Sequence, residues 1–150
     1  MEKVTYKLSI ELERNPRMIK MAQSLTLDLS RPGMGLKGSF GLYGSDEWWK
    51  SIDEGLLKCR KIRGTVTRVY CAGQSEGGKV NSFELKLDDG GKYSESIYVN
   101  ERGDYKLFKV GSVVEILYVF DELKVADSLS GSRYSDIVLR MSVFNGEVES

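Results

Sequence analysis

Apolar and polar residues alternate over most of the second half of the chain, and this period-two pattern constrains the fold more than any other feature. Residues 60–71 (RKIRGTVTRVYC) predict a long strand, with a bulge or bend at Gly64. Residues 113–120 (VVEILYVF) are apolar at successive positions, which is typical of a central strand covered on both faces. Residues 137–143 alternate again and predict the last strand.

A hairpin is predicted between the long strand and the central strand. After a loop at residues 72–79 (AGQSEGGK), residues 81–87 alternate into the turn DDGG at 88–91, and residues 93–99 return. Short strands separated by turn sequences indicate a mainly β fold, a small closed or partly open β-barrel.

The N-terminal part predicts two further strands. Residues 3–13 alternate strictly, the pair Asn15-Pro16 ends that pattern, and residues 24–30 alternate again. Residues 31–44, rich in glycine, form an irregular crossing. We expect one domain over residues 1–150. Its parts are the strand pair with the crossing (1–44), a helix (45–56) and the barrel strands (58–144).

One short helix is predicted at about residues 45–55. Ser45 is a suitable N-cap and Gly55 a suitable C-terminal stop. Trp48, Trp49, Ile52 and Leu56 form a narrow apolar stripe, so the helix is expected to lie across a barrel opening with this stripe inward. The alternative is that the tryptophan pair is an exposed anchor for a partner. Trp49, at the edge of the stripe, is expected to be the more accessible of the two.

Residues 33–38 (GMGLKG) match the G-x-G-x-x-G pattern of nucleotide-binding loops. That pattern works where a strand precedes it and a helix follows at once, with its N-terminal amides toward the phosphate. Here a strand is expected before the pattern, but Gly41 and Gly44 oppose a helix directly after it. We therefore expect a flexible or closely packed crossing rather than a nucleotide site.

Composition excludes several kinds of chemistry. The chain has no histidine, which removes the commonest general base at neutral pH and most zinc sites. Cys59 and Cys71 would lie about 40 Å apart on one extended strand, at ~3.3 Å per residue, so two free, mostly buried thiols are expected. Lysine and arginine number 22, as do aspartate and glutamate. This zero net charge disfavours a phosphate backbone as the partner without excluding a local basic patch.

No catalytic, cofactor-binding or metal-binding residue is predicted. Adjacent carboxylates occur at Asp46/Glu47, Asp88/Asp89 and Asp121/Glu122. Neighbours on a strand point to opposite faces and those in turns are solvated, so none of these pairs resembles an acid–base dyad. No apolar run approaches the ~18 residues of a membrane span. The alternating, acid-containing N-terminus resembles neither a signal nor a transit peptide, and we expect a cytoplasmic protein.

A basic cluster between residues 58 and 68 supplies candidate partner-binding residues. On a strand, Arg60 and Arg68 share one face while Arg63 lies on the other, so the cluster is divided. It either forms a solvated surface or binds an acidic protein or a nucleic acid.

Residues 61–118 resemble the oligonucleotide/oligosaccharide-binding (OB) barrel in the order of their elements. The segments that carry the resemblance are KIRGTVTRVY, FELKLDDGGKYSESIYV and YKLFKVGSVVEILYV. SH3-like barrels share much of this pattern. The resemblance implies a binding face on the second and third strands of the barrel, with Arg63 or Arg68 as phosphate contacts. Phe83 and Tyr93 share the register of the core residues, which leaves Tyr98 as the one stacking candidate.

These features favour binding over catalysis. We expect a bacterial-type inhibitor or immunity protein that neutralises a protein partner such as a toxin by covering its surface. The speculative contact residues are Trp49, Arg60, Arg63, Arg68 and Tyr98. The alternative is an OB-type protein that binds single-stranded nucleic acid.

Overall fold

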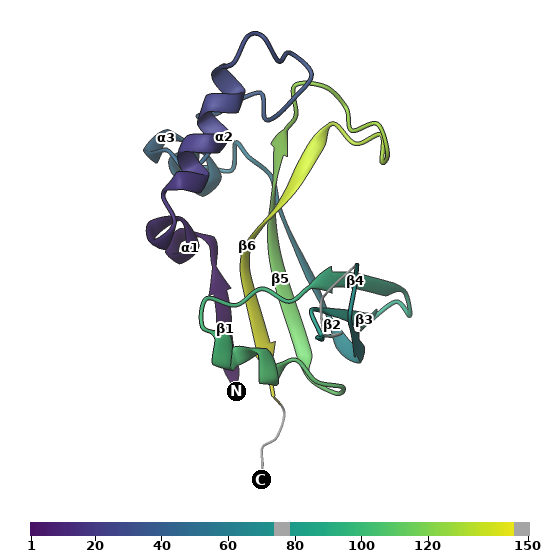
Figure 1. The fold of residues 1–150 in the computed structure, drawn as a ribbon. Coiled ribbons are helices and arrows are strands. Elements are labelled where there is room, and N and C mark those ends of the chain that lie inside the picture. Colours follow the sequence, from purple (N-terminus) through teal and green to yellow (C-terminus); the bar gives the residue numbers. More distant parts are fainter. Residues whose placement is uncertain (74–78, 146–150) are drawn as a thin grey trace. The chain divides into compact units, whose positions relative to one another are not determined.

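The computed structural model describes residues 1–73 and 79–145; residues 74–78, in the predicted loop, and 146–150 lie outside the described residues. Figure 1 shows the elements in chain order. The strands are β1 Glu2–Lys7, β2 Cys59–Tyr70, β3 Ser82–Leu87, β4 Lys92–Ser96, β5 Val113–Glu122 and β6 Tyr134–Phe144. The helices are α1 Leu8–Arg14, α2 Arg17–Leu27, α3 Asp46–Asp53 and the 3-10 helix η2 Arg102–Leu107.

The six strands form one antiparallel sheet in the order β1-β6-β5-β2-β3-β4. Within the described ranges the sheet is open, with β1 and β4 as its edge strands. The mainly β fold class is therefore confirmed, and the sheet is consistent with a small, partly open barrel. The predicted central strand, β5, indeed lies between β6 and β2.

The chain divides into two compact units. Unit 1 contains residues 1–7, 61–117 and 140–150, and unit 2 contains residues 8–60 and 118–139. The single domain over residues 1–150 stays a prediction.

The core of unit 1 is formed by strands that the sequence predicted. Phe83, Leu85, Val114, Ile116, Met141 and Val143 are fully buried. Phe83 stacks on Phe108 with ring centroids 5.4 Å apart, as expected for a core residue. Tyr93 is only half-buried. Burial of this kind supplies the main favourable term in folding.

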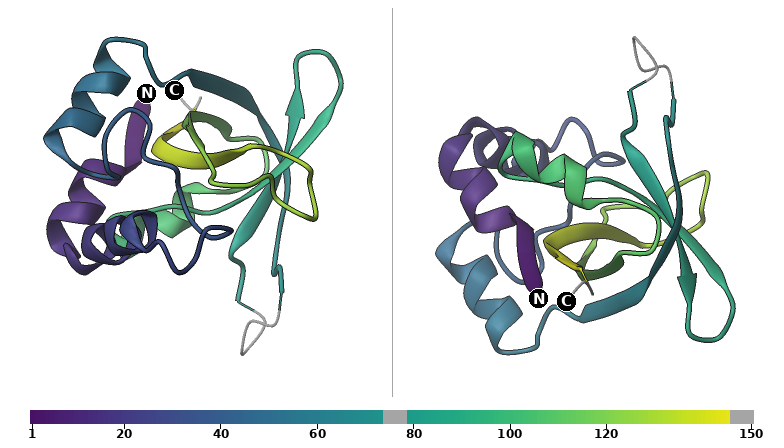
Figure 2. Two further views of the ribbon diagram at one scale, coloured as in Figure 1. Left: turned by 90° about the horizontal axis from the view of Figure 1, so that it is seen from above. Right: turned by 90° about the horizontal axis from the view of Figure 1, so that it is seen from below.

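The hairpin of β3 and β4 has the predicted turn (Figure 2). Gly90 adopts φ 87° and donates its N–H to the Leu87 carbonyl at 2.9 Å. Asp89 accepts the Gly91 N–H at 2.7 Å, which is the turn-forming role expected of this aspartate.

The irregularity predicted in β2 lies elsewhere than expected. The register with β3 shifts between Val66 and Arg68 rather than at Gly64. Gly64 instead marks a close approach of two strands, because a Cβ there would lie 2.7 Å from the Lys86 carbonyl oxygen.

The predicted N-terminal strand pair is wrong. The first strand ends at Lys7, and residues 8–14 form α1, in which Leu8 and Leu12 are buried. Apolar residues four apart lie on one face of a helix, so alternation over five residues fits a helix as well as a strand. The predicted strand at 24–30 is also wrong, because residues 17–27 form α2 and residues 28–30 follow it without strand structure.

The helix α3 confirms the prediction for residues 45–55, although it is not the only helix. The Ser45 hydroxyl accepts the Trp48 N–H at 3.1 Å, and Gly55 has φ 77°. Trp48 is fully buried, and Trp49 is the more accessible of the pair, as expected. Leu56 does not belong to the buried stripe, since it lies beyond the helix and is 52% exposed; Ser51 is buried instead.

Trp48 anchors the core of unit 2. Its indole N–H donates a hydrogen bond to Asp121 Oδ2 at 2.8 Å, and the Asp121 residue is only 2% exposed. The rings of Tyr43 and Trp49 each lie 4.9 Å from the Trp48 ring. Burial raises the pKa of the Asp121 carboxyl above its usual value. The hydrogen bond from Trp48 favours the carboxylate and lowers the pKa, but its effect is smaller than that of burial.

The glycine-rich crossing is a packed segment of unit 2. It follows a helix rather than the expected strand, and no helix begins within residues 31–44, which the structure describes throughout. Its residues 35–37 are tied to the end of β5: the Lys37 N–H donates to the Glu122 carbonyl at 2.8 Å and the Lys124 N–H to the Gly35 carbonyl at 3.0 Å. This is a closely packed crossing, the arrangement that the glycines favoured over a nucleotide loop.

Two glycines of the crossing provide a matched test. Gly41 has φ 111°, and a Cβ there would lie 2.7 Å from the Trp48 backbone nitrogen. We expect Gly41→Ala to lower the free energy of unfolding by about 1–3 kcal/mol. A Cβ at Gly33 would meet nothing within 4 Å. Gly33→Ala should therefore change stability by less than about 0.5 kcal/mol in urea unfolding. An equal loss of unfolding free energy in the two variants would contradict close packing of the crossing at Gly41.

Candidate functional site

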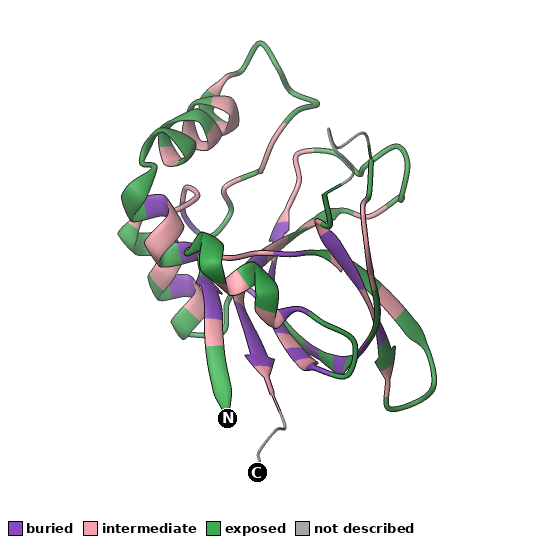
Figure 3. Ribbon diagram, turned by 60° about the horizontal axis from the view of Figure 1, so that its bottom comes forward, coloured by how far each residue is buried: buried purple, intermediate pink, exposed green. Residues whose placement is uncertain are grey.

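The helix α2 (Arg17–Leu27) has no buried residue, which distinguishes it from the other α-helices of unit 2. In Figure 3 no part of this helix has the colour of buried residues. Its sequence RMIKMAQSLTL consists largely of good helix formers, and Pro16 precedes it. A helix of 11 residues is marginal alone in water, so α2 depends on contacts along one side.

That contact side rests on the glycine-rich crossing. Gly44 and Gly35 lie beneath Ile19 and Leu25, so closely that an added Cβ would lie 3.0 and 2.8 Å from these side chains. Gln23 Nε2 donates a hydrogen bond to the Tyr43 carbonyl at 2.9 Å. The glycines thus serve as a platform for α2.

The adjacent side of α2 is accessible and carries both methionines and cations. Met18 is 39% and Met21 is 65% exposed, and Arg17 and Lys20 are exposed beside them. A groove of about 540 Å³ runs along this side, and we call it the α2 groove. Its lining residues are Arg17, Lys20, Met21, Ser24, Leu25, Asp28 and Arg31.

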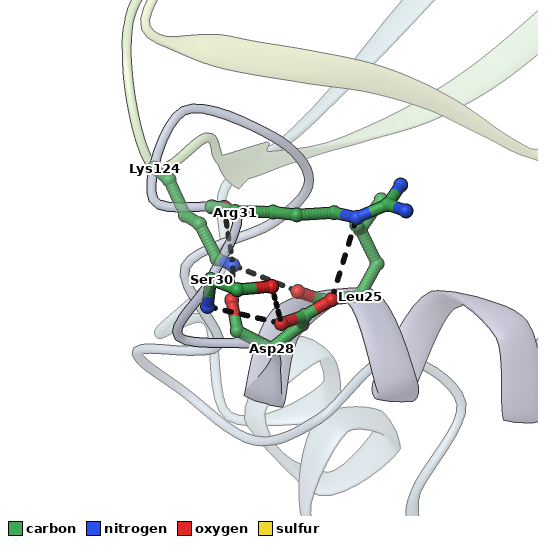
Figure 4. A network of polar contacts seen from close by, with 5 residues as sticks. All are labelled: Leu25, Asp28, Ser30, Arg31 and Lys124. Atoms are coloured by element: carbon green, nitrogen blue, oxygen red, sulfur yellow. Dashed lines mark hydrogen bonds and ion pairs between the residues drawn. The ribbon is translucent and has the colours of Figure 1, made fainter.

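Lys124 fixes the end of the α2 groove (Figure 4). Its ammonium donates to the carbonyls of Leu25 at 2.7 Å, Arg31 at 3.2 Å and Asp28 at 3.4 Å. Carbonyls at the end of a helix lack partners within the helix, and a cation also matches the negative end of the helix dipole. Lys124 therefore holds both the last turn of α2 and the loop after it.

Asp28 completes this network. Its Oδ1 accepts the Ser30 hydroxyl at 2.6 Å and the Ser30 N–H at 3.0 Å, and its Oδ2 lies 3.4 Å from Arg31 Nε. The Ser30 hydrogen bonds, more than the Arg31 charge, lower the pKa of Asp28 below its usual value. The resulting stabilisation of the loop is present above the unfolded pKa of about 4 and is lost as pH falls through the lowered folded value.

Removing the Lys124 ammonium tests the fixed end of the groove. We expect Lys124→Met to speed amide exchange at Asp28 and Arg31 about 5–10-fold. The N–H groups of these two residues donate to the carbonyls of Leu25 and Asp28, and both carbonyls lose the charged donor that holds them in place. Lys109→Met, at an exposed position of unit 1, is the matched control and should leave exchange at both amides unchanged. Unchanged exchange in Lys124→Met would show that the lysine does not hold this loop.

A second hollow of unit 2 is smaller and more aromatic. It has a volume of about 260 Å³ and is lined by Phe40, Leu56, Leu57, Lys58, Phe120, Glu122 and Tyr134. Leu56 and Tyr134 are largely exposed. Glu122 is paired with Lys37 at 3.5 Å and has the Ser39 hydroxyl 3.4 Å away. This aromatic pocket can take an apolar side chain, and its rim carries both signs of charge.

The residues predicted from sequence do not form one site. Trp49 and Arg60 belong to unit 2, where Trp49 is half-buried against Trp48 and Arg60 is exposed. Arg63, Arg68 and Tyr98 belong to unit 1.

The three residues in unit 1 already have intramolecular partners. Arg63 pairs with Glu115 at 3.3 Å and its guanidinium lies 4.2 Å from the Phe144 ring centre. Arg68 lies 3.7 Å from Glu84 and 4.1 Å from the Tyr70 ring centre. Both arginines keep more than half of their side-chain surface accessible, but part of each charge is already neutralised.

Tyr98 is not on a strand, since β4 ends at Ser96. Its ring lies 5.0 Å from that of Tyr6, and its carbonyl accepts the Thr5 hydroxyl at 3.0 Å. Burial, and secondly the Glu95 charge, raise the pKa of this half-buried tyrosine. Tyr98 therefore packs beside β1 rather than standing free for base stacking.

Sequence reasoning missed the α2 groove because residues 24–30 were assigned to a strand and residues 17–23 to no element. The signal was available: helix formers fill residues 17–27 between Pro16 and Asp28, with Met18, Met21, Ala22 and Leu25 at helical spacing. The network of Lys124 had no signal, because it joins residues more than 90 positions apart.

The cysteines, possible metal ligands and helices of the described residues are further candidate functional features. Cys59 is exposed and Cys71 half-buried, and both are free thiols, so the expectation that they are mostly buried is wrong. Residues 1–73 and 79–145 contain no group of three or more Cys, Asp and Glu side chains placed to hold a metal ion. Of the helices that the structure describes, none has the length and apolar character needed to span a membrane.

No curated protein matches the chain. The family model described as immunity protein RhsI2 matches residues 1–144, nearly the whole sequence. The chain therefore belongs to the RhsI2 immunity protein family.

Proposed function

We propose that this immunity protein neutralises its toxin by binding it stoichiometrically, without catalysis, in the cytoplasm of the bacterium that makes it. The match to an immunity protein family over residues 1–144 carries this proposal. The exposed free thiol of Cys59 suits a reducing compartment such as the cytoplasm.

The chemistry of the described residues supports binding rather than turnover. Among the carboxyls of residues 1–73 and 79–145, Asp121 alone has a clearly raised pKa, which is the property expected of a general acid. It is 2% exposed and accepts the Trp48 indole N–H, so solvent and substrate do not reach it. Its role is to position Trp48 in the core.

Accessible surfaces of unit 2 support contact with a protein. The α2 groove and the aromatic pocket combine exposed apolar side chains with charged rims, the composition typical of protein interfaces. Arg60, which is exposed, fits a contact role better than Arg63 and Arg68, whose charges are paired with Glu115 and Glu84.

We further propose that the OB-like segment, residues 61–118, is a scaffold rather than a nucleic-acid surface. The pairing of β2 with β3 and of β3 with β4 supports the OB likeness. The packing of Tyr98 against Tyr6 removes the stacking platform that nucleic-acid binding would need.

A growth assay tests the proposed function. The toxin encoded by the neighbouring gene is expressed in a susceptible host, with or without this chain. We expect growth to be restored when the chain is present and the toxin to co-purify with it. Continued growth arrest despite folded, abundant chain would contradict the proposal.

A further inference from the structure

We infer that the α2 groove is a docking surface for the toxin and that it recognises an acidic segment carrying an apolar side chain. This inference rests on the proposed function and adds to it the surface and the chemistry of recognition. It concerns unit 2 alone.

The apolar part of the groove is accessible and adaptable. Met21 is 65% exposed and lines the groove together with Leu25, which is half-buried. Methionine is unbranched and polarisable, so it fits partner surfaces of irregular shape. Accessible apolar surface with a charged border is typical of an interaction site.

The charge of the groove selects the partner. Arg17, Lys20 and Arg31 are its cations, and Asp28 is the only carboxylate among its lining residues. Asp28 is already engaged by Ser30 and Arg31, and α2 itself contains no acidic residue. The groove thus has a positive surplus in a chain whose net charge is zero. An acidic partner surface complements it.

The groove is also held in shape before the partner arrives. The crossing supports α2 from below through the Gln23–Tyr43 hydrogen bond, and Lys124 holds the loop from Leu25 to Arg31. A prearranged surface loses less conformational entropy on binding. The aromatic pocket lacks the charge preference, because Lys58 and Glu122 both line it.

Charge reversal tests the inference. We would measure the dissociation constant of the full-length chain for the purified toxin of the neighbouring gene, at about 50 mM and about 300 mM NaCl. Arg17→Glu with Lys20→Glu should weaken binding at least about 100-fold at low salt and flatten its salt dependence. The matched control, Lys106→Glu with Lys109→Glu, makes the same charge change at exposed positions of unit 1 and should bind within about 3-fold of the wild type.

Two further variants keep the test decisive. Met21→Ala should weaken binding about 10-fold at both salt concentrations, since it removes apolar contact only. If the double reversal lowers the unfolding midpoint in urea, Arg17→Gln with Lys20→Gln replaces it, with an expected weakening of about 10-fold.

The outcomes separate the surface from the function. If the wild type binds the toxin and the α2 variants bind equally well, the docking surface is wrong while the immunity function stands. If the wild type does not bind the toxin, the proposed function fails and the inference with it. Binding of a single-stranded oligonucleotide that Arg17→Glu with Lys20→Glu abolishes, without an effect on toxin binding, would assign the groove to nucleic acid and overturn the inference.

Discussion

Replacing Trp48 by alanine should lower the free energy of unfolding by about 3–5 kcal/mol, the largest loss expected from any single side chain of unit 2. The side chain is fully buried and touches the rings of Tyr43 and Trp49. Its removal leaves a cavity and also leaves the buried Asp121 without its indole donor. Urea unfolding at pH 7 measures the change directly.

The two parts of this loss can be separated. Trp48→Phe keeps much of the ring but removes the indole N–H, and it should cost about 1–3 kcal/mol. Trp49→Ala is the matched control, because Trp49 is its sequence neighbour and only half-buried, and it should cost less than Trp48→Ala. A larger loss for Trp49→Ala than for Trp48→Ala would contradict the placement of the two rings.

Replacing Asp121 by asparagine should change how stability depends on pH. The pKa of Asp121 is raised in the folded state, so the folded chain holds this proton more tightly than the unfolded chain does. The wild type therefore loses stability as pH rises from the unfolded pKa of about 4 through the raised folded value. Asparagine carries no charge and retains a carbonyl oxygen for the Trp48 N–H.

The expected result is a stability difference that grows with pH. Within that pH window, the free energy of unfolding of Asp121→Asn should rise relative to that of the wild type by up to about 1.4 kcal/mol per pH unit. Above the window, the difference between the two should stay constant. Asp127→Asn is the control of opposite sign, because hydrogen bonds from Ser130 lower the pKa of this exposed aspartate. A difference between Asp121→Asn and the wild type that does not vary with pH would show that burial leaves this carboxyl unshifted.

The sheet and α3 could be predicted because their signals are local. The Asp88-Asp89-Gly90-Gly91 turn sets the register of β3 and β4, and the Ser45 cap begins α3 where its hydroxyl meets the Trp48 N–H. The turn and the cap each involve residues no more than four positions apart. The apolar run at residues 113–120 predicted a central strand, and β5 indeed pairs with β6 on one edge and with β2 on the other.

The N-terminal helices could not be predicted from alternation. Leu8 and Leu12 satisfy a period of two and a helical spacing of four equally well, and packing decided between them. At Leu25, Leu27 and Leu29 the alternation crosses the end of α2, so a regular pattern spans two different conformations. The glycine-rich crossing fixes α2 as a helix by supporting Ile19 and Leu25.

The candidate site was the hardest part to predict for a related reason. Arg63 and Arg68 read as free charges in the sequence, but cross-strand neighbours Glu115 and Glu84 engage them. Lys124 reads as an ordinary surface lysine, but its ammonium reaches three carbonyls of the α2 segment. Such partners are distant in the sequence and cannot be read from it. They determine which charged side chains remain available to bind a toxin.

A titration of toxin activity tests the central claim most directly. Purified chain is added in increasing amounts to a fixed concentration of its toxin, well above the dissociation constant, and the remaining activity is measured. Binding without catalysis predicts a linear fall that ends at a fixed stoichiometric ratio, whatever the incubation time. Complete loss of activity at far less than one chain per toxin, progressing with time, would reveal turnover and contradict the account.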